Sequence, residues 1–541
     1  MERTKKITIL FLFVASFAFS QNFYFEIIFK DKGSVPLSDA EQFLSAASIE
    51  KKAKRGVEID FFDLPLVSSY IETIELQGVD VVKQSKWRNS VLILTQDSSL
   101  IAPVRSILFV KSATFFTELP NETFKSQNKF ADEEVQWYSH KYGQSLNQLS
   151  MLNGHFLHER GFNGEGMDIA IFDAGFPEMF SAITLLKEQG RIKNTYDFVD
   201  HDATVFEKDQ HGAMVLSVMA SNDDHMFGAA PMANYHLFIT EDAQKESLLE
   251  EYNWLMAAEM ADSIGVDVVN SSLGYTTFDN EATNHSYADM DGKTTLVTQA
   301  ANTLFRKGVF VVSSAGNSAQ TDWHFISAPA DGDSVLAVGA VDKNKNYAFF
   351  SSTGKSFDGD IKPNVSAQGH QTILAHTSNG YVAGSGTSFS GPIVAGLTAC
   401  YWQAFPDLKN WELKNQLELN ASQYSTPDSL LGFGLPNYMT MYMNARKNDE
   451  FVYGQSFLIS LRNNPFTDHV GIELYSAIEQ NVHFLLLDVN GKEIRNVDYV
   501  VTKNEYSIFG LDDLKSLSTG IYFLRVYGEN GEWLTKKVLK L

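Results

Sequence analysis

Four apolar runs constrain the fold of this 541-residue chain more than any other feature. Each is a near-continuous stretch of Val, Ile, Leu, Phe and Ala that ends in small residues, and helical patterns separate the runs. Strands of this composition have both faces buried, as in a parallel sheet covered by helices. The runs are MDIAIFDAG, VDVVNSSLG, VFVVSSAGN and SVLAVGAV. We therefore predict an α/β domain with helices on both faces of the sheet, over residues 136–447.

The N-terminus has the composition of a secretory signal peptide. Three basic residues (Arg3, Lys5 and Lys6) precede an apolar run at 7–19 that is too short to span a bilayer comfortably. Ala18-Phe19-Ser20 supplies a small-x-small cleavage signal. We expect residues 1–20 to be removed on export, and no membrane span in the mature protein.

Charge and cysteine content exclude some functions. The chain has 43 basic and 66 acidic residues and a net charge of −23, which disfavours nucleic acid as a partner. Its one cysteine, Cys400, excludes an intramolecular disulfide. Cys400 lies in an apolar helical pattern, so we expect it to be buried in the core.

The regions that flank the central domain have other patterns. Residues 21–117 predict a small unit of β-α-β-β-α-β order, in which one helix covers 38–56, begins at a Ser38/Glu41 capping box and ends at Gly56. Residues 118–135 show no apolar periodicity and read as a linker. Residues 454–541 consist of short apolar runs broken by turn signals, which predicts a small β-sandwich.

The segment SGTSFSGPIVAG at 385–396 predicts a buried helix with unusual residues at its start. Proline is tolerated in the first turn of a helix, so Pro392 places the start near Ser388. The ordinary interpretation of Ser388 is an N-cap residue, and the alternative is a nucleophile. A nucleophilic serine needs a histidine and an acid elsewhere in the chain.

Three further polar residues supply what that alternative requires. Asp173 and Asn317 each follow a predicted strand, and His211 begins a helical pattern. Taken singly, they could be turn residues and a structural histidine. Taken together with Ser388, they match a nucleophile, a base, an acid that orients the base, and an amide donor for an oxyanion. The chain order Asp, His, Ser is one of the known orders of such a triad.

The motifs around these residues resemble those of the subtilisin-like serine peptidases, or subtilases. They are IFDAGF, QHGAMVLSVMA, SSLG, SAGN and GTSFSGPIVAG, in that order. The resemblance implies that Ser388 is the nucleophile, His211 the general base, Asp173 its orienting acid and Asn317 the oxyanion donor. No cofactor is then required for the chemistry.

The same resemblance implies a substrate cleft. Ser272, Leu273 and Gly274 resemble the segment that pairs with the substrate backbone. Ser314, Ala315 and Gly316 resemble the opposite wall of the primary specificity pocket, and Ala328-Pro329 matches a peptide bond that is often cis in the family. Many subtilases bind structural calcium, but no ligand spacing here identifies a site, and the metal ligands stay unknown.

The chain departs from the subtilase pattern at several positions, none of which carries a catalytic atom. Ala213 and Met214 replace the usual Thr and second His, Phe389-Ser390 replaces Met-Ala, and Ala174 replaces Thr or Ser. Asn317 argues against the related sedolisins, which have Asp at this position. The departures affect the shape of the cleft rather than the reaction.

The flanks extend the resemblance. Residues 21–130 resemble the propeptides of exported bacterial subtilases, and residues 454–541 resemble the C-terminal sorting domain of type IX secretion cargo. We therefore expect a secreted or cell-surface endopeptidase whose partners are protein or peptide substrates, its own propeptide and the secretion machinery. The alternatives are a catalytically inactive subtilase fold that serves as a surface binding protein, an esterase with the same triad, and an adhesive or carbohydrate-binding C-terminal module.

Overall fold

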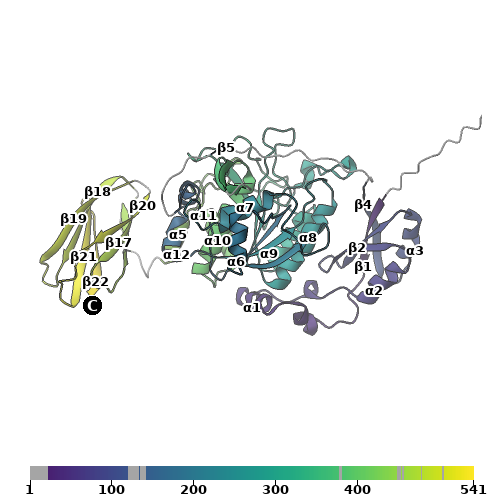
Figure 1. Ribbon diagram of the computed structural model, residues 1–541, viewed down its shortest axis with the longest axis horizontal. Coiled ribbons are helices and arrows are strands. Elements are labelled where there is room, and N and C mark those ends of the chain that lie inside the picture. Colours follow the sequence, from purple (N-terminus) through teal and green to yellow (C-terminus); the bar gives the residue numbers. More distant parts are fainter. Residues whose placement is uncertain are drawn as a thin grey trace, which may run out of the picture.

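The computed structural model describes residues 22–119, 133–134, 142–376, 380–446, 452–453, 456–476, 478–502 and 505–541. The signal peptide expected over 1–20 and most of the linker expected over 118–135 lie outside the described residues. Figure 1 shows three folded units along the long axis of the molecule: a small N-terminal sheet with helices, a large central α/β unit and a C-terminal sandwich. Within the described residues, no helix is both long enough and apolar enough to cross a membrane.

The central unit is built on a seven-stranded parallel sheet, as the apolar runs predict. Its strand order is β12-β11-β10-β9-β6-β8-β7, so the order reverses between β9 and β6. The strands are β6 (Asp168–Asp173), β7 (Ile192–Asp197), β8 (Asn234–Ile239), β9 (Val268–Ser271), β10 (Phe310–Ser314), β11 (Leu336–Val341) and β12 (Val365–Gln368). The expected fold class is confirmed.

Helices cover both faces of this sheet, and alternate residues of β6 face the two resulting cores. Ile169 and Ile171 pack in the core with α7 (His211–Ala220) and α10 (Thr387–Ala404). Ala170 and Phe172 pack in the other core, with α8 (Leu249–Ile264) and α9 (Leu296–Arg306). The remaining helices of this unit are α4 (Leu146–Ser150), α5 (His155–Glu159), α6 (Ser181–Glu188), α11 (Asn410–Leu419), α12 (Tyr438–Ala445) and the 3₁₀ helices η4 (Glu281–Thr283) and η5 (Tyr287–Asp289). A hairpin of β13 (Thr372–His376) and β14 (Gly380–Gly384) completes the unit, and β5 (Glu133–Glu134) pairs with β14.

The N-terminal unit is an antiparallel sheet of order β2-β3-β1-β4. It contains β1 (Asn22–Phe29), α2 (Ser68–Glu75), β2 (Asp80–Ser85), β3 (Ser90–Thr95), α3 (Ile101–Arg105) and β4 (Val110–Leu119), with a 3₁₀ turn η3 (Ser98–Leu100) before α3. Trp87 and Leu92 of this sheet share a hydrophobic core with α8 and α9, so the sheet packs directly on those two helices.

The helix predicted over 38–56 is wrong in its first half. The chain forms a 3₁₀ helix η1 (Leu37–Phe43), breaks at Ser45, and then forms α1 (Ala46–Arg55), which ends at Gly56 as expected. Ser45 accepts a bond from the backbone N–H of Ser48, so it is the N-cap in place of Ser38. The backbone N–H of Ser45 also donates to Ser263 of α8, a tertiary contact that no local pattern reveals. A short 3₁₀ turn η2 (Phe61–Asp63) follows.

The C-terminal unit is a sandwich of two four-stranded antiparallel sheets, β15-β16-β17-β20 and β19-β18-β21-β22. Its strands bury their own core, which includes Ile472, Phe484 and Leu524. Ion pairs of Arg160 with Glu473 and of Arg462 with Glu159 join it to the central unit. The strands are β15 (Val452–Tyr453), β16 (Phe457–Arg462), β17 (Val470–Ser476), β18 (Gln480–Leu487), β19 (Glu493–Val501), β20 (Glu505–Leu511), β21 (Gly520–Gly528) and β22 (Trp533–Lys540).

Candidate active site

The candidate residues gather at the carboxyl edge of the central sheet. Asp173 is the last residue of β6, Ser272 directly follows β9, and Ser314 ends β10. Parallel strands carry their carboxyl ends to one edge, where loops and helix N-termini meet. The structure thus places there the residues that the sequence analysis singled out.

Asp173 and His211 form a buried pair. His211 Nδ1 lies 2.8 Å from Asp173 Oδ1, and both side chains are almost fully buried. The carboxylate can only accept, so Nδ1 donates the proton and Nε2 remains the basic nitrogen of the ring. Asp173 Oδ1 also accepts the backbone N–H of Ala174 at 2.8 Å, which fixes the carboxylate.

Two glycines allow the His211 helix to begin against the end of β6. A Cβ atom on Gly212 would lie 2.6 Å from the carbonyl oxygen of Gly175 and 2.9 Å from Asp173 Cβ. A Cβ atom on Gly175 would lie 2.4 Å from the carbonyl oxygen of Asp209. Side chains at either position would push the histidine helix away from the aspartate, so the Asp–His distance depends on these glycines.

Ser388 is the second residue of α10, whose N-cap is Gly386. The N–H groups of a first helical turn have no acceptor within the helix, so the Ser388 N–H belongs to a set of donors that face outward. The Ser388 hydroxyl donates to the carbonyl of Ser272 at 3.3 Å. The ring of the next residue, Phe389, lies 6.1 Å from the His211 ring, which places the start of α10 beside the imidazole.

The sequence analysis expected Pro392 in the first turn of the helix. In the structure it is the sixth residue of α10, which places it in the second turn. A proline there removes the hydrogen bond to the carbonyl four residues earlier, which is that of Ser388. The Ser272 hydroxyl replaces the missing donor, at 2.9 Å from the Ser388 carbonyl oxygen. Pro392 therefore leaves the Ser388 carbonyl free to accept a hydrogen bond from Ser272 at the end of β9, and it does not mark the start of the helix.

Asn317 is held by its carboxamide oxygen. That oxygen accepts the backbone N–H of Thr387 at 2.8 Å and its hydroxyl at 3.0 Å, and the Thr387 hydroxyl in turn accepts the Gly316 N–H at 3.1 Å. With the oxygen occupied, the amide NH₂ of Asn317 points to the other side, where the side chain is exposed to solvent. Asn317 is thus joined to Thr387, the residue that precedes Ser388 at the start of α10.

The two predicted cleft segments lie at the carboxyl ends of the neighbouring strands β9 and β10, and both approach Ser327. A Cβ atom on Gly274 would lie 2.2 Å from Ser327 Oγ, and one on Gly316 (φ +105°) would lie 3.1 Å from it. Ser327 Oγ is buried and has no hydrogen-bond partner among the described residues. Sequence reasoning missed Ser327, although it directly precedes Ala328-Pro329, whose peptide bond is cis as expected.

Comparison with known proteins decides the family. The family model described as "Subtilase family" matches residues 164–434, half of the chain. The chain belongs to the subtilase family. Two further models match this subtilase: "Peptidase S8 propeptide domain, Bacteroidota" at residues 24–132, and "Secretion system C-terminal sorting domain" at residues 463–540.

Relatives of this subtilase include several bacterial proteases. It is 29% identical to subtilisin DY of Bacillus licheniformis over 51% of this chain and 90% of that protein. It is 27% identical to M-protease of Shouchella clausii over 73% of this chain and 93% of that protein. A mutant of the epidermin leader peptide processing serine protease of Staphylococcus aureus has the same fold, with a TM-score of 0.54 at 15% identity over 78% of this chain and 99% of that one. The chain is therefore a subtilisin-like serine peptidase, and its sorting domain indicates a secreted or cell-surface protein.

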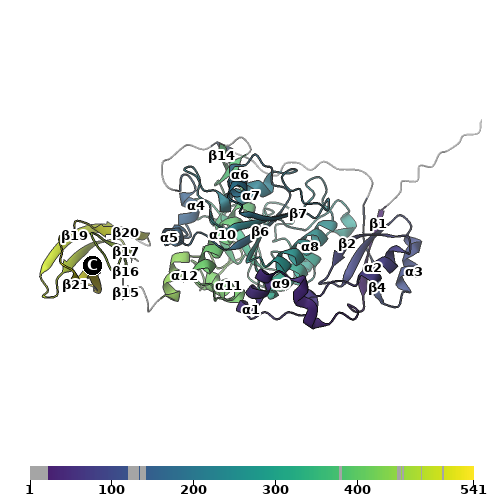
Figure 2. The ribbon, with the colours of Figure 1, turned by 60° about the horizontal axis from the view of Figure 1, so that its bottom comes forward.

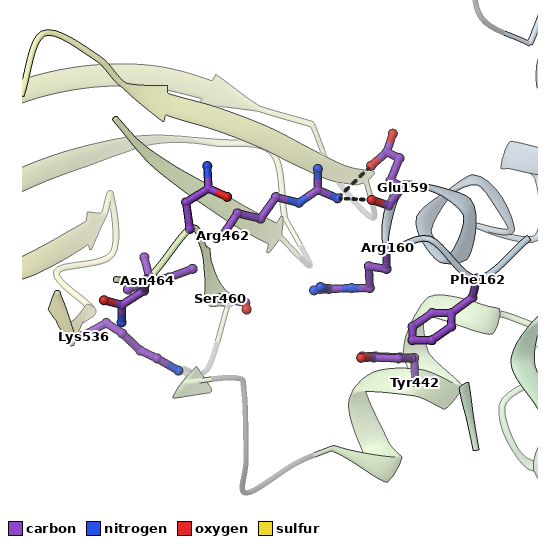
Figure 3. A pocket seen from close by; sticks show the side chains of 10 residues that line it. Glu159, Arg160, Phe162, Tyr442, Ser460, Arg462, Asn464 and Lys536 are labelled. Carbon is purple, nitrogen blue, oxygen red and sulfur yellow. Dashed lines mark hydrogen bonds and ion pairs between the residues drawn. The ribbon is translucent and has the colours of Figure 1, made fainter. Parts of the chain in front are cut away.

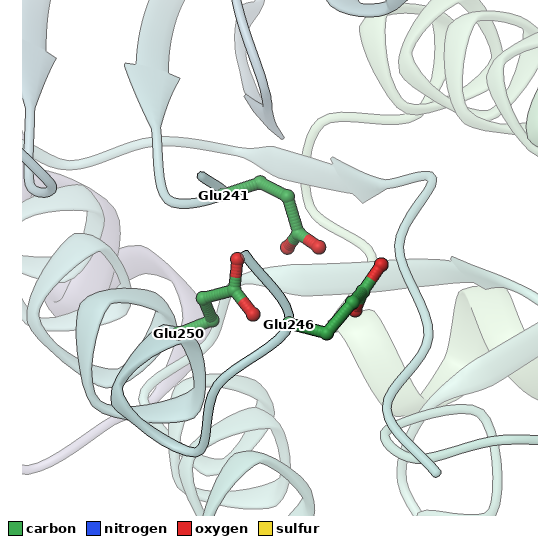
Figure 4. A group of neighbouring side chains, drawn as sticks. All are labelled: Glu241, Glu246 and Glu250. Carbon is green, nitrogen blue, oxygen red and sulfur yellow. The ribbon is translucent and has the colours of Figure 1, made fainter. Parts of the chain in front are cut away.

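Three carboxylates gather between the end of β8 and the start of α8, as Figure 4 shows: Glu241, Glu246 and Glu250. Carboxylate oxygens are ligands that Ca²⁺ prefers, but the Glu250 oxygens already accept the backbone N–H groups of Asp242 and Ser247, at 2.9 and 2.8 Å. Burial, and then the neighbouring glutamates, raise the pKa of Glu250 well above its usual value. Glu250 thus has a structural task, since it fastens the loop after β8 to the start of α8.

A cavity of about 620 Å³ lies elsewhere, between the central unit and the sandwich (Figure 3). Its lining comes from the end of α5, from α12 and from the sandwich strands, and includes Arg160, Tyr442 and Arg462. These residues belong to the junction between the two units, and none of the candidate active-site residues lines this cavity.

Proposed function

We propose that this subtilase is an endopeptidase that hydrolyses peptide bonds through Asp173, His211 and Ser388 and an acyl-enzyme intermediate. The observation that carries the proposal is the buried Asp173–His211 pair, at 2.8 Å, beside the first turn of the Ser388 helix. A carboxylate that fixes the histidine tautomer next to a serine at a helix N-terminus is the arrangement that acyl transfer needs.

The reaction proceeds in two halves. The Ser388 hydroxyl exchanges its bond to the Ser272 carbonyl for one to His211 Nε2, and its oxygen attacks the carbonyl carbon of the scissile peptide bond while Nε2 takes its proton. His211 gives that proton to the departing amine, which leaves an ester on Ser388. A water molecule, deprotonated by Nε2, then attacks the ester and releases the acid.

Groups that are fixed in the free enzyme stabilise the charges that develop in the transition state. Asp173 stabilises the imidazolium that forms when Nε2 takes the proton. The Asn317 amide and the Ser388 N–H donate to the oxyanion of each tetrahedral intermediate, and since α10 and Asn317 are already locked through Thr387, little reorganisation is required.

An extended peptide substrate is expected to lie between Ser272–Gly274 and Ser314–Gly316. Gly274, Ala315 and Gly316 are small, and from this we expect a large apolar side chain before the scissile bond. The Ser327 hydroxyl lies close to where a Cβ atom on Gly274 would be, and so adds a polar atom between the two segments. We further propose the domain limits 1–20 for the signal peptide, 21–130 for the propeptide, 136–447 for the peptidase and 454–541 for the sorting domain, with the propeptide and the secretion machinery as partners.

Active-site labelling tests the proposal against the alternative of an inactive surface binding protein. A fluorophosphonate probe should label the matured protein but not Ser388→Ala, and casein hydrolysis should fall by a factor on the order of 10⁶, the magnitude characteristic of subtilisins. Ser390→Ala is the matched control, because Ser390 lies on the same helix and its hydroxyl donates to the Thr387 carbonyl. Equal labelling of wild type and Ser388→Ala would refute the assignment, and absence of labelling in both would favour the inactive alternative.

A further inference from the structure

One part of the propeptide leaves its own sheet and contacts the peptidase unit at a second place. This part, residues 30–67, lies between β1 and α2 and is called the arm here. Figures 1 and 2 show its helix α1 beneath the central unit, apart from the four-stranded sheet. The arm contacts the starts of β6 and β9, at the amino edge of the central sheet, whereas the candidate triad lies at the carboxyl edge.

The start of α1 donates hydrogen bonds to the last carbonyl groups of α8. Ser45 donates to the carbonyls of Ser263 and Ile264, through its N–H at 2.8 Å and its hydroxyl at 2.9 Å, and the Ser48 hydroxyl donates to the Asp262 carbonyl at 2.7 Å. The last carbonyls of a helix lack donors within the helix. The arm supplies these donors, so its position on α8 is set by directional hydrogen bonds.

The basic side of α1 neutralises two adjacent carboxylates. Lys51 Nζ lies 2.8 Å from a carboxylate oxygen of Asp168 and 2.8 Å from one of Asp267. Arg55 pairs with the other oxygen of Asp267, and its guanidinium lies 4.1 Å from the centre of the Trp402 ring. Without the arm, the two carboxylates would face each other with no positive charge from α1 between them.

Asp168 and Asp267 lie at the junction between the two halves of the central sheet. Asp168 begins β6 and Asp267 directly precedes β9, and these two strands pair where the strand order of the sheet reverses. The β6 side of this junction carries Asp173 and His211, and the β9 side leads to Asn317 and Ser388. Lys51 therefore bridges the two halves of the sheet that together form the candidate active site.

Other ion pairs also join the arm to the peptidase unit. Because the arm contributes both acidic and basic side chains to them, the contact has a specific register. Lys307, at the end of α9, lies 2.6 Å from Asp60 and 2.7 Å from Asp63 of the arm. Lys52 of the arm pairs with Asp262 of α8. Except for Asp60, these side chains are buried, and breaking one partner of a buried pair is strongly destabilising.

We propose that the arm is a second docking element of the propeptide, which binds the amino edge of the peptidase sheet by ion pairs and holds its two halves together. The propeptide is then held at two places, by its sheet on α8 and α9 and by α1 at the amino edge. The surface under α1, with Asp168, Asp262 and Asp267, is a binding site for a basic helix, and its occupant is the propeptide after cleavage. This rests on the proposed function only in that the propeptide is cut from the peptidase.

The release rate of the cut propeptide tests this. The full-length Ser388→Ala chain, with a recognition sequence for a site-specific protease inserted in the 118–135 segment, is immobilised by its C-terminus and cut. Propeptide release should be on the order of 10- to 100-fold faster when Lys51→Ala/Arg55→Ala is added than for the Ser388→Ala chain alone, because partly buried, hydrogen-bonded charge pairs act mainly on dissociation. The matched control is Lys54→Ala/Lys111→Ala, which removes two exposed charges of the same propeptide. Lys54 lies on α1 and pairs with Asp407 of the peptidase unit at 3.4 Å, but this pair is exposed to solvent and should contribute little.

The salt dependence of propeptide release from the Ser388→Ala chain is a second measurement. It does not require that a variant of the arm folds. Raising NaCl from about 0.1 to 1 M should speed release of the propeptide from this chain, and should act less on Lys51→Ala/Arg55→Ala. Release from that variant at the rate of the control, or a salt-independent rate for the Ser388→Ala chain alone, overturns the proposal. Since the chain carries Ser388→Ala and is cut by an added protease, these rates do not depend on whether the triad assignment holds.

Discussion

The two edges of the central sheet are built from different chemistry. The carboxyl edge holds its groups with glycines, hydroxyls and one amide, and within it the Asp173–His211 contact is a close, buried pair. The amino edge is held by lysines, an arginine and aspartates that come from two parts of the chain. On the proposed function, the first edge keeps atoms in place through many turnovers, and the second binds a propeptide segment that is cut from the peptidase.

If both proposals hold, one sheet carries out catalysis at one edge and binds its propeptide at the other. Short, uncharged contacts such as Thr387 to Asn317 are insensitive to salt and leave little freedom of movement. Ion pairs between separate segments weaken with ionic strength and can re-form in the same register. Changes at the carboxyl edge should therefore alter turnover, and changes beyond it should alter binding, stability or export.

The largest effect among the remaining tests is expected for Asn317→Ala. It removes one of the two proposed oxyanion donors, so kcat should fall by about 10²–10³, the magnitude characteristic of subtilisins, with KM nearly unchanged. Steady-state kinetics on a chromogenic peptide measure both constants, with the exposed turn variant Asn344→Ala as the control. A change mainly in KM would assign Asn317 to substrate binding and weaken the contrast between the edges.

A smaller effect is expected for Gly212→Ala, which adds a Cβ atom 2.6 Å from the Gly175 carbonyl oxygen. Overpacking of this kind costs about 1–3 kcal/mol of stability, and here it should also lower kcat because it separates His211 from Asp173. Thermal unfolding and kinetics are compared with Gly396→Ala, whose added Cβ atom would lie 2.7 Å from Ala229 Cβ, away from the triad. If both variants lose stability and keep kcat, the glycine contacts do not set the catalytic geometry.

The smallest effect on turnover is expected from truncation after Lys447. The sandwich buries its own core, so the matured peptidase without it should keep its activity to within roughly a factor of two. In the native host, the truncated form should stay in the periplasm while the full-length protein reaches the medium or the cell surface. Cell fractionation with activity measured in each fraction is the test, and normal export of the truncated form would remove the sorting role.

Much of this architecture could be predicted from the sequence because its signals are local. The apolar runs end in Asp173, SSLG and SAGN, and a strand with both faces buried has few alternatives to a parallel sheet covered by helices. The same holds for Gly56 at the end of α1. The catalytic roles of Asp173, His211, Asn317 and Ser388 remain predictions that the labelling and kinetic experiments address.

Only the tertiary structure decided the features that depend on residues far apart in the chain. Pro392 reads as a first-turn residue until the Ser272 hydroxyl is seen to replace its missing hydrogen bond. Ser327 becomes notable only between Gly274 and Gly316, and Ser45 breaks the expected helix where it contacts α8. Local periodicity shows which face of a helix or strand is apolar. A hydrogen bond or ion pair to a distant residue does not change that periodicity. For this reason the surface to which the arm binds could be identified only in the folded chain.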